Sequence, residues 1–337
     1  MSIISKQREL LFDNLRGVLI FLVILGHALE YFRLNNEIAE FFYVFIYLFH
    51  MPVFIFISGY FSKRVQKGRK SAVKTFLIPY LILNFILSII LLLMGKIETI
   101  TILNPGWTLW YLYCMFIWRL LLPDLIKVRH VLLFSFIVGI FSGLLTEFGT
   151  YMAMARTLGF LPFFLAGYYT DRKLIEKLRH FPFARLLGFS VVLIGLLTAF
   201  IWLKAQLPPE ILWGDRAYDL FEIPLWQNIL ADMFLYALGF AFVFAFLVMA
   251  TEKRHFYTVW GQNTLAIYLL HIYLIAPIVQ LGEFIQNPLR HGLILVGGAL
   301  LTVYILSRPL VTHRLGIVIK KVNQWIMPEK NKKRTKE

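Results

Sequence analysis

The stretch FDNLRGVLIFLVILGH, residues 12–27, is an apolar run with two charged residues, Asp13 and Arg16, near one end and a histidine at the other. It continues to residue 33 and so can cross a membrane, because a spanning helix needs about 20 mostly apolar residues. None of the apolar runs in the chain shows the period-two alternation of a membrane barrel. The sequence therefore predicts an all-α polytopic membrane protein of about ten transmembrane helices. The other nine expected spans are residues 40–62, 74–94, 105–123, 130–148, 153–170, 184–203, 229–250, 258–281 and 291–310.

The composition of the 337 residues supports a membrane protein. Hydrophobic residues make up 59% and charged residues 16%, against about 45–50% and about 25% in soluble chains. The mean hydropathy is +0.71. A water-soluble globule of this length could not bury so much apolar surface. The composition thus excludes a soluble enzyme, a disordered chain and a secreted disulfide scaffold. The single cysteine, Cys114, excludes an internal disulfide and a cysteine zinc site, and we expect no metal.

Lysine and arginine concentrate in every second loop, which sets the expected orientation. With a cytoplasmic N-terminus, the outer segments hold only Arg33, Lys96, Arg156, Lys204, Arg216 and Arg290. Both ends are then cytoplasmic, with one membrane domain over residues 1–322 and a basic cytoplasmic tail over 323–337. Topology and contact with anionic membrane lipids account for the net charge of +15, so we expect no nucleic-acid partner.

Ionisable residues inside spans are costly and often mark function. The first span carries Asp13, Arg16, His27 and Glu30. Arg16 and His27 are eleven positions apart, so on a helix they differ by about 20° in direction and about 16 Å along the axis. One helix face is therefore expected to reach both ends of a long ligand that crosses the membrane. Asp13 is too far along the helix to orient His27, so Glu30 or a residue on another helix is expected to do so.

Two further spans place a histidine at a similar depth. His50 begins FHMPVFIFISGYF, residues 49–61, in which Pro52 should kink the helix and Ser58 allows close approach. His271 ends GQNTLAIYLLH, residues 261–271. The alternative interpretation is that each histidine only hydrogen-bonds a neighbouring helix. Arg119 and Arg156 lie near span ends and are expected to snorkel. The outer segment 204–228 is expected to cover an outer-facing pocket.

Together these segments resemble the acyltransferase-3 family of integral membrane acyltransferases, especially its fucose 4-O-acetylase-like branch. The resemblance rests on residues 12–27 with the Arg16 to His27 spacing, on 49–61, on GWTLWYL at 106–112, and on 261–271. One departure concerns the paired arginines of the family at the cytoplasmic start of the third span. Here Arg69, Lys70 and Lys74 stand in that region, and lysine lacks the bidentate fork of arginine.

The resemblance implies an O-acyltransferase, most often an O-acetyltransferase, in the plasma membrane of a bacterium. Its donor would be cytoplasmic acyl-coenzyme A, and its acceptor a hydroxyl of a surface glycan or of a lipid-linked precursor. His27 and Arg16 would be catalytic, with His27 acting as a general base or as a transient acyl carrier. Arg16, Arg69, Lys70 and Lys74 would bind coenzyme A phosphates. The supporting pocket residues would be Asp13, Glu30, His50, Ser58, Trp110, Tyr111, Asn263 and His271.

Two other functions fit parts of the pattern. Buried histidine, arginine and aspartate on kinked helices also suit a transporter that exports a glycan or a small molecule. The sequence shows no repeated halves and no matched pair of broken helices, which disfavours a transporter. A membrane sensor or structural protein is the third possibility, and it would not need the shared face of Arg16 and His27.

Overall fold

The computed structural model describes residues 9–106, 108–144, 151–215, 217–218, 223–282 and 284–327, and the regular elements within them are all helical. Seven helical segments there are long and apolar enough to cross a membrane. The predicted all-α polytopic membrane fold is confirmed. The seven segments are Leu10–Asn35, Glu37–Tyr60, Val65–Leu93, Ala184–Lys204, Leu225–Met249, Thr264–Gly282 and Pro288–Leu306.

Three of the ten expected spans fall on shorter helices. The expected span 105–123 becomes α6 (Trp110–Leu125), and 130–148 becomes α7 (Val131–Phe141), which ends in a 3-10 turn. The expected span 153–170 is divided between α8 (Met154–Gly159) and α9 (Leu161–Tyr169). Because Pro162 lacks a backbone N–H, it stands at the start of a new helix instead of continuing the old one.

Prolines also divide or bend the longer spans. The second span is a pair, α2 (Glu37–Tyr47) and α3 (His50–Tyr60), and Pro52 lies in the first turn of α3. The third span joins α4 (Val65–Ala72) to α5 (Ile78–Leu93) through a π-helical turn, Val73–Leu77, just before Pro79. Such turns arise where the regular hydrogen-bond ladder is interrupted.

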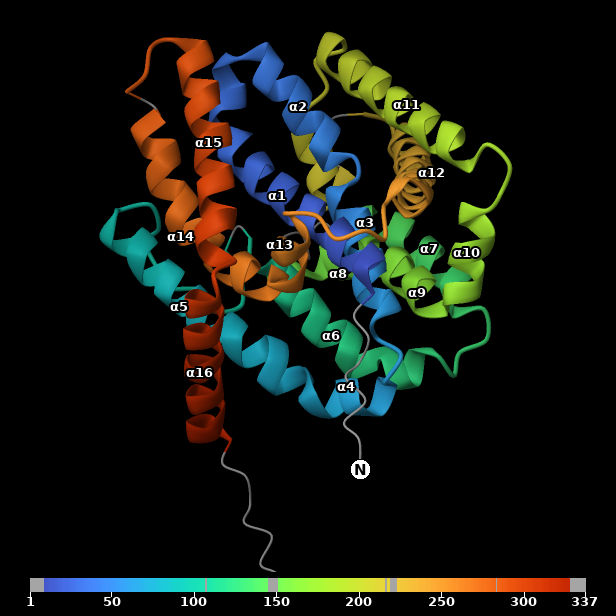
Figure 1. The fold of residues 1–337 in the computed structure, drawn as a ribbon, viewed down its shortest axis with the longest axis horizontal. Helices are drawn as coiled ribbons and strands as arrows, with labels where there is room; N and C mark the ends of the chain where they lie inside the picture. The colour runs from blue at the N-terminus through green and yellow to red at the C-terminus, as the bar shows by residue number, and fades with distance from the viewer. Residues whose placement is uncertain are drawn as a thin grey trace, which may run out of the picture.

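The helix α1 (Leu10–Phe32) runs through the centre of the molecule (Figure 1). It contacts α2 and α3 on one side and α13 (Thr258–Gln262), α14 (Thr264–Gly282) and α15 (Pro288–Leu306) on the other. The periphery is formed by α11 (Ala184–Lys204) and α12 (Leu225–Met249), with α10 (Arg172–Arg179) below them in Figure 1. Since α1 is central, its polar face looks into the protein.

The last helix, α16 (Pro309–Ile326), projects from the body on the same lower side as the start of α1 (Figure 1). It begins after Ser307, where Pro309 ends the last membrane helix. It includes residues 323–326 of the expected basic tail, and the Asn323 side chain donates to the Lys74 carbonyl at 3.0 Å. The remainder of that tail after residue 327 lies outside the described residues.

The ion pairs separate into two groups that match the alternation of loop charge. On the expected inner side, Arg172 pairs with Glu9 at 3.9 Å and with Glu252 at 2.7 Å, and Arg69 pairs with Asp124 at 2.9 Å. On the expected outer side the pairs are Arg33–Glu210, Lys204–Glu37 and Arg156–Asp215. Within the described residues, no ion pair joins an inner segment to an outer one. The loops expected on each side therefore lie together.

Two glycines allow a close helix contact between α3 and α9. A Cβ atom at Gly59 would overlap the carbonyl oxygen of Phe164, and a Cβ atom at Gly167 would overlap that of Phe56. The backbones therefore touch at this crossing, as small residues permit in membrane helix pairs. This contact fixes α3, which carries His50 and Ser58.

We predict that Gly59→Ala lowers the melting temperature of the protein in detergent, because overpacking a tight contact costs about 1–3 kcal/mol. The matched control is Gly297→Ala on α15, where an added Cβ atom meets nothing within 4 Å. There alanine should be neutral or slightly stabilising, since it favours a helix over glycine by about 1 kcal/mol. Equal melting temperatures for the two variants would contradict the contact.

Candidate active site

A cavity of about 180 Å³ lies beside α1 at the depth of His27. Its wall includes His27 and Glu30 from α1, His50 from α3, and Trp110 and Tyr111 from α6. His271 of α14 lies behind His27, with the two rings stacked at 5.5 Å between centroids. Three helices distant in sequence thus bring the three predicted histidines to one place.

Hydrogen bonds fix the tautomers of two of these histidines. Nδ1 of His50 donates to the Ile46 carbonyl at 2.9 Å, and Nδ1 of His271 donates to the Tyr268 carbonyl at 2.7 Å. Each ring then carries a lone pair on Nε2, because neutral imidazole has one N–H. His271 is fully buried, and its Nε2 has no hydrogen-bond partner within the described part of the chain.

Glu30 is the carboxylate beside His27. Its Oε2 lies 3.7 Å from Nδ1 of His27, and both side chains are mostly buried. A carboxylate on this side of the ring favours the neutral tautomer with its proton on Nδ1. The basic lone pair is then on Nε2. Asp13 lies instead at the other end of α1, where its Oδ1 is 2.6 Å from Nη2 of Arg16.

Polar side chains continue from the cavity toward Arg16. The hydroxyl of Tyr111, which lines the cavity, is 2.6 Å from the Ser58 hydroxyl. Ser58 itself donates to the Phe54 carbonyl at 2.9 Å, so Tyr111 is the donor of that bond. Phe61 follows the last residue of α3, and the Arg16 guanidinium lies 4.9 Å from the centre of its ring. This arrangement connects the two ends of the Arg16–His27 face.

Arg119, which the sequence predicted only to snorkel, is a further cation on this line. Its side chain is half-buried, and Nη2 is 3.5 Å from the Phe61 carbonyl. Gly68 of α4 leaves room for it, because a Cβ there would approach Nη1 to 3.0 Å. Arg119 and Arg16 therefore flank Phe61.

Asp13 and Asn14 hold the segment that leads into α14. Asn14 donates to the carbonyls of Thr251 and Lys253, both at 2.8 Å, and accepts from the Thr258 hydroxyl at 2.5 Å. Asp13 accepts from Gln262 at 3.3 Å. The sequence analysis missed Asn14, although an amide beside Asp13 in an apolar helix is itself a signal of a polar contact.

Asn263, predicted to line the pocket, instead caps the junction between α13 and α14. Its amide donates to the Val259 carbonyl at 2.9 Å and to the Ser307 carbonyl at 3.3 Å. It is not among the residues that line the cavity. The Val259 carbonyl also accepts from the Asn263 backbone N–H at 3.2 Å, so the side chain reinforces the junction and ties it to the end of α15.

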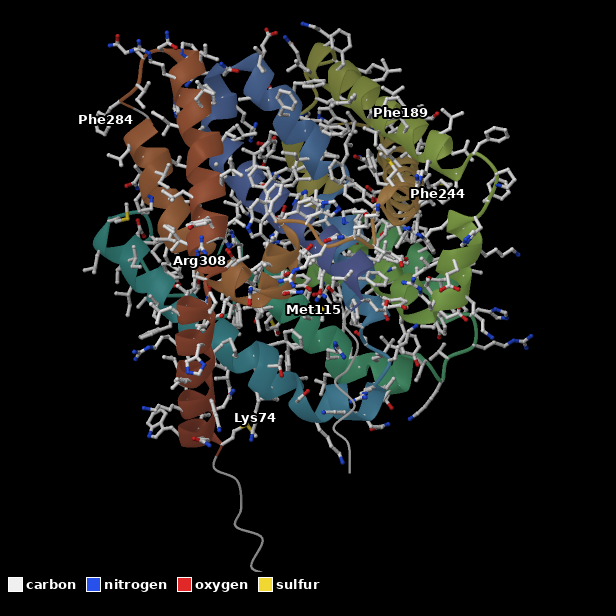
Figure 2. All side chains as sticks on the ribbon, in the orientation of Figure 1. Lys74, Met115, Phe189, Phe244, Phe284 and Arg308 are labelled. Carbon is white, nitrogen blue, oxygen red and sulfur yellow. The ribbon has the colours of Figure 1, made fainter. Side chains whose placement is uncertain are left out.

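The predicted phosphate-binding cations lie away from the cavity, on the side expected to be cytoplasmic. Arg69 pairs with Asp124, Lys70 is exposed, and Lys74 stands in the π-helical turn. Figure 2 shows Lys74 near the lower edge of the molecule, on the side toward which α16 points. In the described parts of the chain, no group of three histidine, cysteine, aspartate or glutamate side chains is arranged to hold a metal ion.

The expected cover of the cavity is present in part. The 3-10 turn Pro209–Trp213 and the residues just after it contribute to the cavity wall, through Leu212, Trp213 and Asp215. Arg156 from α8 lines the cavity beside them. The expectation that Arg156 snorkels is wrong, because its side chain is only 13% exposed and pairs with Asp215 at 2.6 Å. Asp219 and Glu222 of the same segment lie outside the described residues.

Comparisons with known proteins point to one family. A family model described as "Acyltransferase domain" matches residues 10–308. The nodulation protein NolL of Mesorhizobium japonicum is 44% identical over 61 residues, which is 17% of this chain and 16% of that protein. NolL of Sinorhizobium fredii is 41% identical over 61 residues, 17% of each chain. The match thus spans about a sixth of these relatives. No solved structure matches the chain.

We predict that Asn14→Asp lowers the melting temperature, because aspartate cannot donate to the carbonyls of Thr251 and Lys253. Asn14 is only 2% exposed, so a side chain there that cannot make these two bonds costs about 1–3 kcal/mol. The control is Asn287→Asp, where the side-chain oxygen only accepts from the Arg290 N–H as a helix cap. Aspartate caps as well as asparagine does, so that variant should melt like the parent. Equal loss in both variants would contradict the role of Asn14.

Proposed function

Because this chain belongs to the acyltransferase family whose model matches residues 10–308, we propose that it is an O-acyltransferase working across the plasma membrane of a bacterium. It moves an acyl group, most often acetyl, from cytoplasmic acyl-coenzyme A to a hydroxyl of a surface glycan or its lipid-linked precursor. The observation that carries this proposal is the cavity around His27. His50 lines the same cavity, and the His271 ring stacks on that of His27.

His27 is the general base in this proposal. The acceptor hydroxyl gives its proton to Nε2 of His27 while its oxygen attacks the thioester carbonyl. The carbon–sulfur bond breaks, and the coenzyme A thiolate leaves and takes the proton from the imidazolium. Glu30, 3.7 Å from Nδ1, favours the tautomer in which Nε2 carries no proton. Its charge also stabilises the imidazolium that forms during transfer. The same geometry allows a two-step route, in which Nε2 of His27 carries the acyl group before the hydroxyl attacks.

The donor is proposed to enter from the inner side, past Arg16. Arg16 is partly exposed and its charge is oriented by Asp13, while Arg119 lies on the other side of Phe61. Arginine binds phosphate oxygens through two parallel N–H groups, which suits this position for the coenzyme A phosphates. Arg69, Lys70 and Lys74 are then proposed to attract the donor by charge at the membrane surface. The thioester end extends along Ser58 and Tyr111 toward His27.

The experiment that tests the function is mass spectrometry of surface glycans and lipid-linked precursors. Three strains are compared: one with the chain, one without it, and one with His27→Ala. We expect one acyl group to disappear from a glycan in both the deletion and the variant. A second assay adds radiolabelled acetyl-coenzyme A to isolated membranes. If the chain is a transporter, no glycan becomes labelled, and that result would overturn the acyltransferase proposal for this substrate class.

We predict that His27→Ala lowers acyl transfer in membranes at least about 100-fold, the contribution of a positioned general base. Glu30→Gln should lower transfer by about tenfold, because the carboxylate only orients and stabilises the ring. The matched control is His313→Ala on α16, an exposed histidine that should keep full activity. Full activity of a folded His27→Ala protein would contradict the assignment.

We predict that Arg16→Gln raises the KM for acetyl-coenzyme A by about ten- to a hundredfold, the range for a lost hydrogen bond to a charged group. The KM for the glycan acceptor should change little. The control is Lys127→Gln, which removes an inner-side cation that is 72% exposed and pairs with Asp124. A raised acceptor KM with an unchanged donor KM would show that Arg16 binds the acceptor, and would contradict its assignment to the donor.

A further inference from the structure

The cover of the cavity carries a buried ion pair. Nη2 of Arg156 on α8 lies 2.6 Å from Oδ2 of Asp215, and the two side chains are only 13% and 7% exposed. Arg156 is fixed by two more contacts. Its Nε donates to the Trp213 carbonyl at 2.9 Å, and its guanidinium lies 4.8 Å from the centre of the Trp110 ring. Asp215 is therefore held in one place at the cavity wall.

Two buried polar atoms of this cavity have no partner within the part of the chain that the structure describes. They are Oδ1 of Asp215, the carboxylate oxygen that Arg156 does not use, and the hydroxyl oxygen of Thr108. Thr108 is 2% exposed. Buried polar atoms are nearly always hydrogen-bonded, because leaving one without a partner costs free energy. Two such atoms in one cavity point to a ligand that supplies hydroxyl groups.

The charge of the pair narrows the chemistry of that ligand. Arg156 already neutralises Asp215, so the site favours a neutral donor over a cation. The indole ring of Trp110 adds an apolar wall. A hydroxyl for Asp215, another for Thr108, and C–H groups that pack beside Trp110 are what a sugar ring offers. Stacking on Trp110 is not required, because Arg156 and Phe160 already contact that ring.

A second ion pair on the same outer side shows what a purely structural pair looks like here. Arg33 and Glu210 lie 2.9 Å apart, with Arg33 7% exposed, and the Arg33 guanidinium stands 4.7 Å from the centre of the Tyr43 ring. Neither Arg33 nor Glu210 lines the cavity. The two pairs are alike in chemistry and in the burial of the arginine. Glu210 is 27% exposed and Asp215 only 7%, and of the two carboxylates only Asp215 lines the cavity.

We propose that Asp215, held by Arg156, accepts a hydrogen bond from a hydroxyl of the acceptor sugar, and that Thr108 and Trp110 complete this acceptor subsite. The inference rests on the proposed function and names the part of the site that selects the acceptor. In it the sugar enters beneath the outer cover, one hydroxyl is bound at Asp215, and another is presented to His27. Asp215 takes no part in proton transfer and does not touch the donor.

The test measures the acceptor and donor KM values separately, in membranes or purified protein. The acceptor is a glycan and lipid-linked saccharide extract from cells that lack the chain, and the donor is radiolabelled acetyl-coenzyme A. We expect Asp215→Ala to raise the acceptor KM by about ten- to a hundredfold. The donor KM should stay within about twofold. The control is Glu210→Ala. Glu210 lies in the same outer segment as Asp215 and pairs with the buried Arg33, and its removal should leave both KM values unchanged.

Thr108→Val tests the subsite without touching the ion pair. It should raise the acceptor KM by about two- to tenfold, the range for a neutral hydrogen bond. The double variant with Arg156→Asp and Asp215→Arg restores a pair of opposite charges but moves the carboxylate to the other side. It should recover the melting temperature lost in Asp215→Ala while the acceptor KM stays high.

Each result decides the inference. An unchanged acceptor KM in Asp215→Ala, an equal rise in Glu210→Ala, or recovery of the acceptor KM by the charge swap would overturn the subsite. If Asp215→Ala does not fold, an unchanged acceptor KM in Thr108→Val overturns it. These results leave the proposed function standing, because the parent chain still transfers label. If the parent chain itself labels no component of the extract, the proposed function fails, and the acceptor subsite fails with it.

Discussion

The contact between α1 and the segment 251–263 fixes the central pair of helices, α1 and α14, beside the candidate active-site cavity. A Cβ atom at Gly261 would overlap the Asp13 carbonyl, and one at Gly17 would overlap the Tyr257 carbonyl, so the two backbones touch. Asn14 then ties the carbonyls of Thr251 and Lys253 to α1. Because α14 starts directly after this segment, the contact determines where α14 lies beside α1. That placement stacks His271 on His27.

The membrane explains why the polar residues form one continuous line. In hydrocarbon every polar group must find its partner within the protein, so polar side chains gather on the inner faces of helices. Here the line runs from Arg16 past Ser58 and Tyr111 to the cavity at His27. A donor with a charged, phosphate-rich end and an uncharged acyl end fits such a line, in the orientation that the loop charges predict.

The two ends of the line differ in construction. At the inner end the cations are partly exposed, as Arg16 and Arg69 are, which suits attraction of an anionic substrate from water. At the outer end Arg156 and Asp215 are buried and neutralise each other beneath the cover. In the proposed acceptor subsite, the carboxylate oxygen that Arg156 does not use accepts a hydroxyl, and the neutral pair does not attract ions. This difference fits the proposed charged donor and the proposed neutral acceptor.

From the sequence alone one can predict the apolar spans, the separation of the loops into two sides, and the shared face of Arg16 and His27. These follow from length, loop charge and helical period, which are properties of single segments. Trp110, Tyr111 and Asn263 were all expected at the pocket, and the packing of the helices was needed to show that the first two line the cavity while Asn263 lies at a helix junction. The tertiary structure also decided that Arg156 pairs with Asp215, that Arg119 flanks Phe61, and that three expected spans are short or broken. Helical period fixes directions within one helix, but the neighbour that a side chain meets depends on close packing between distant segments.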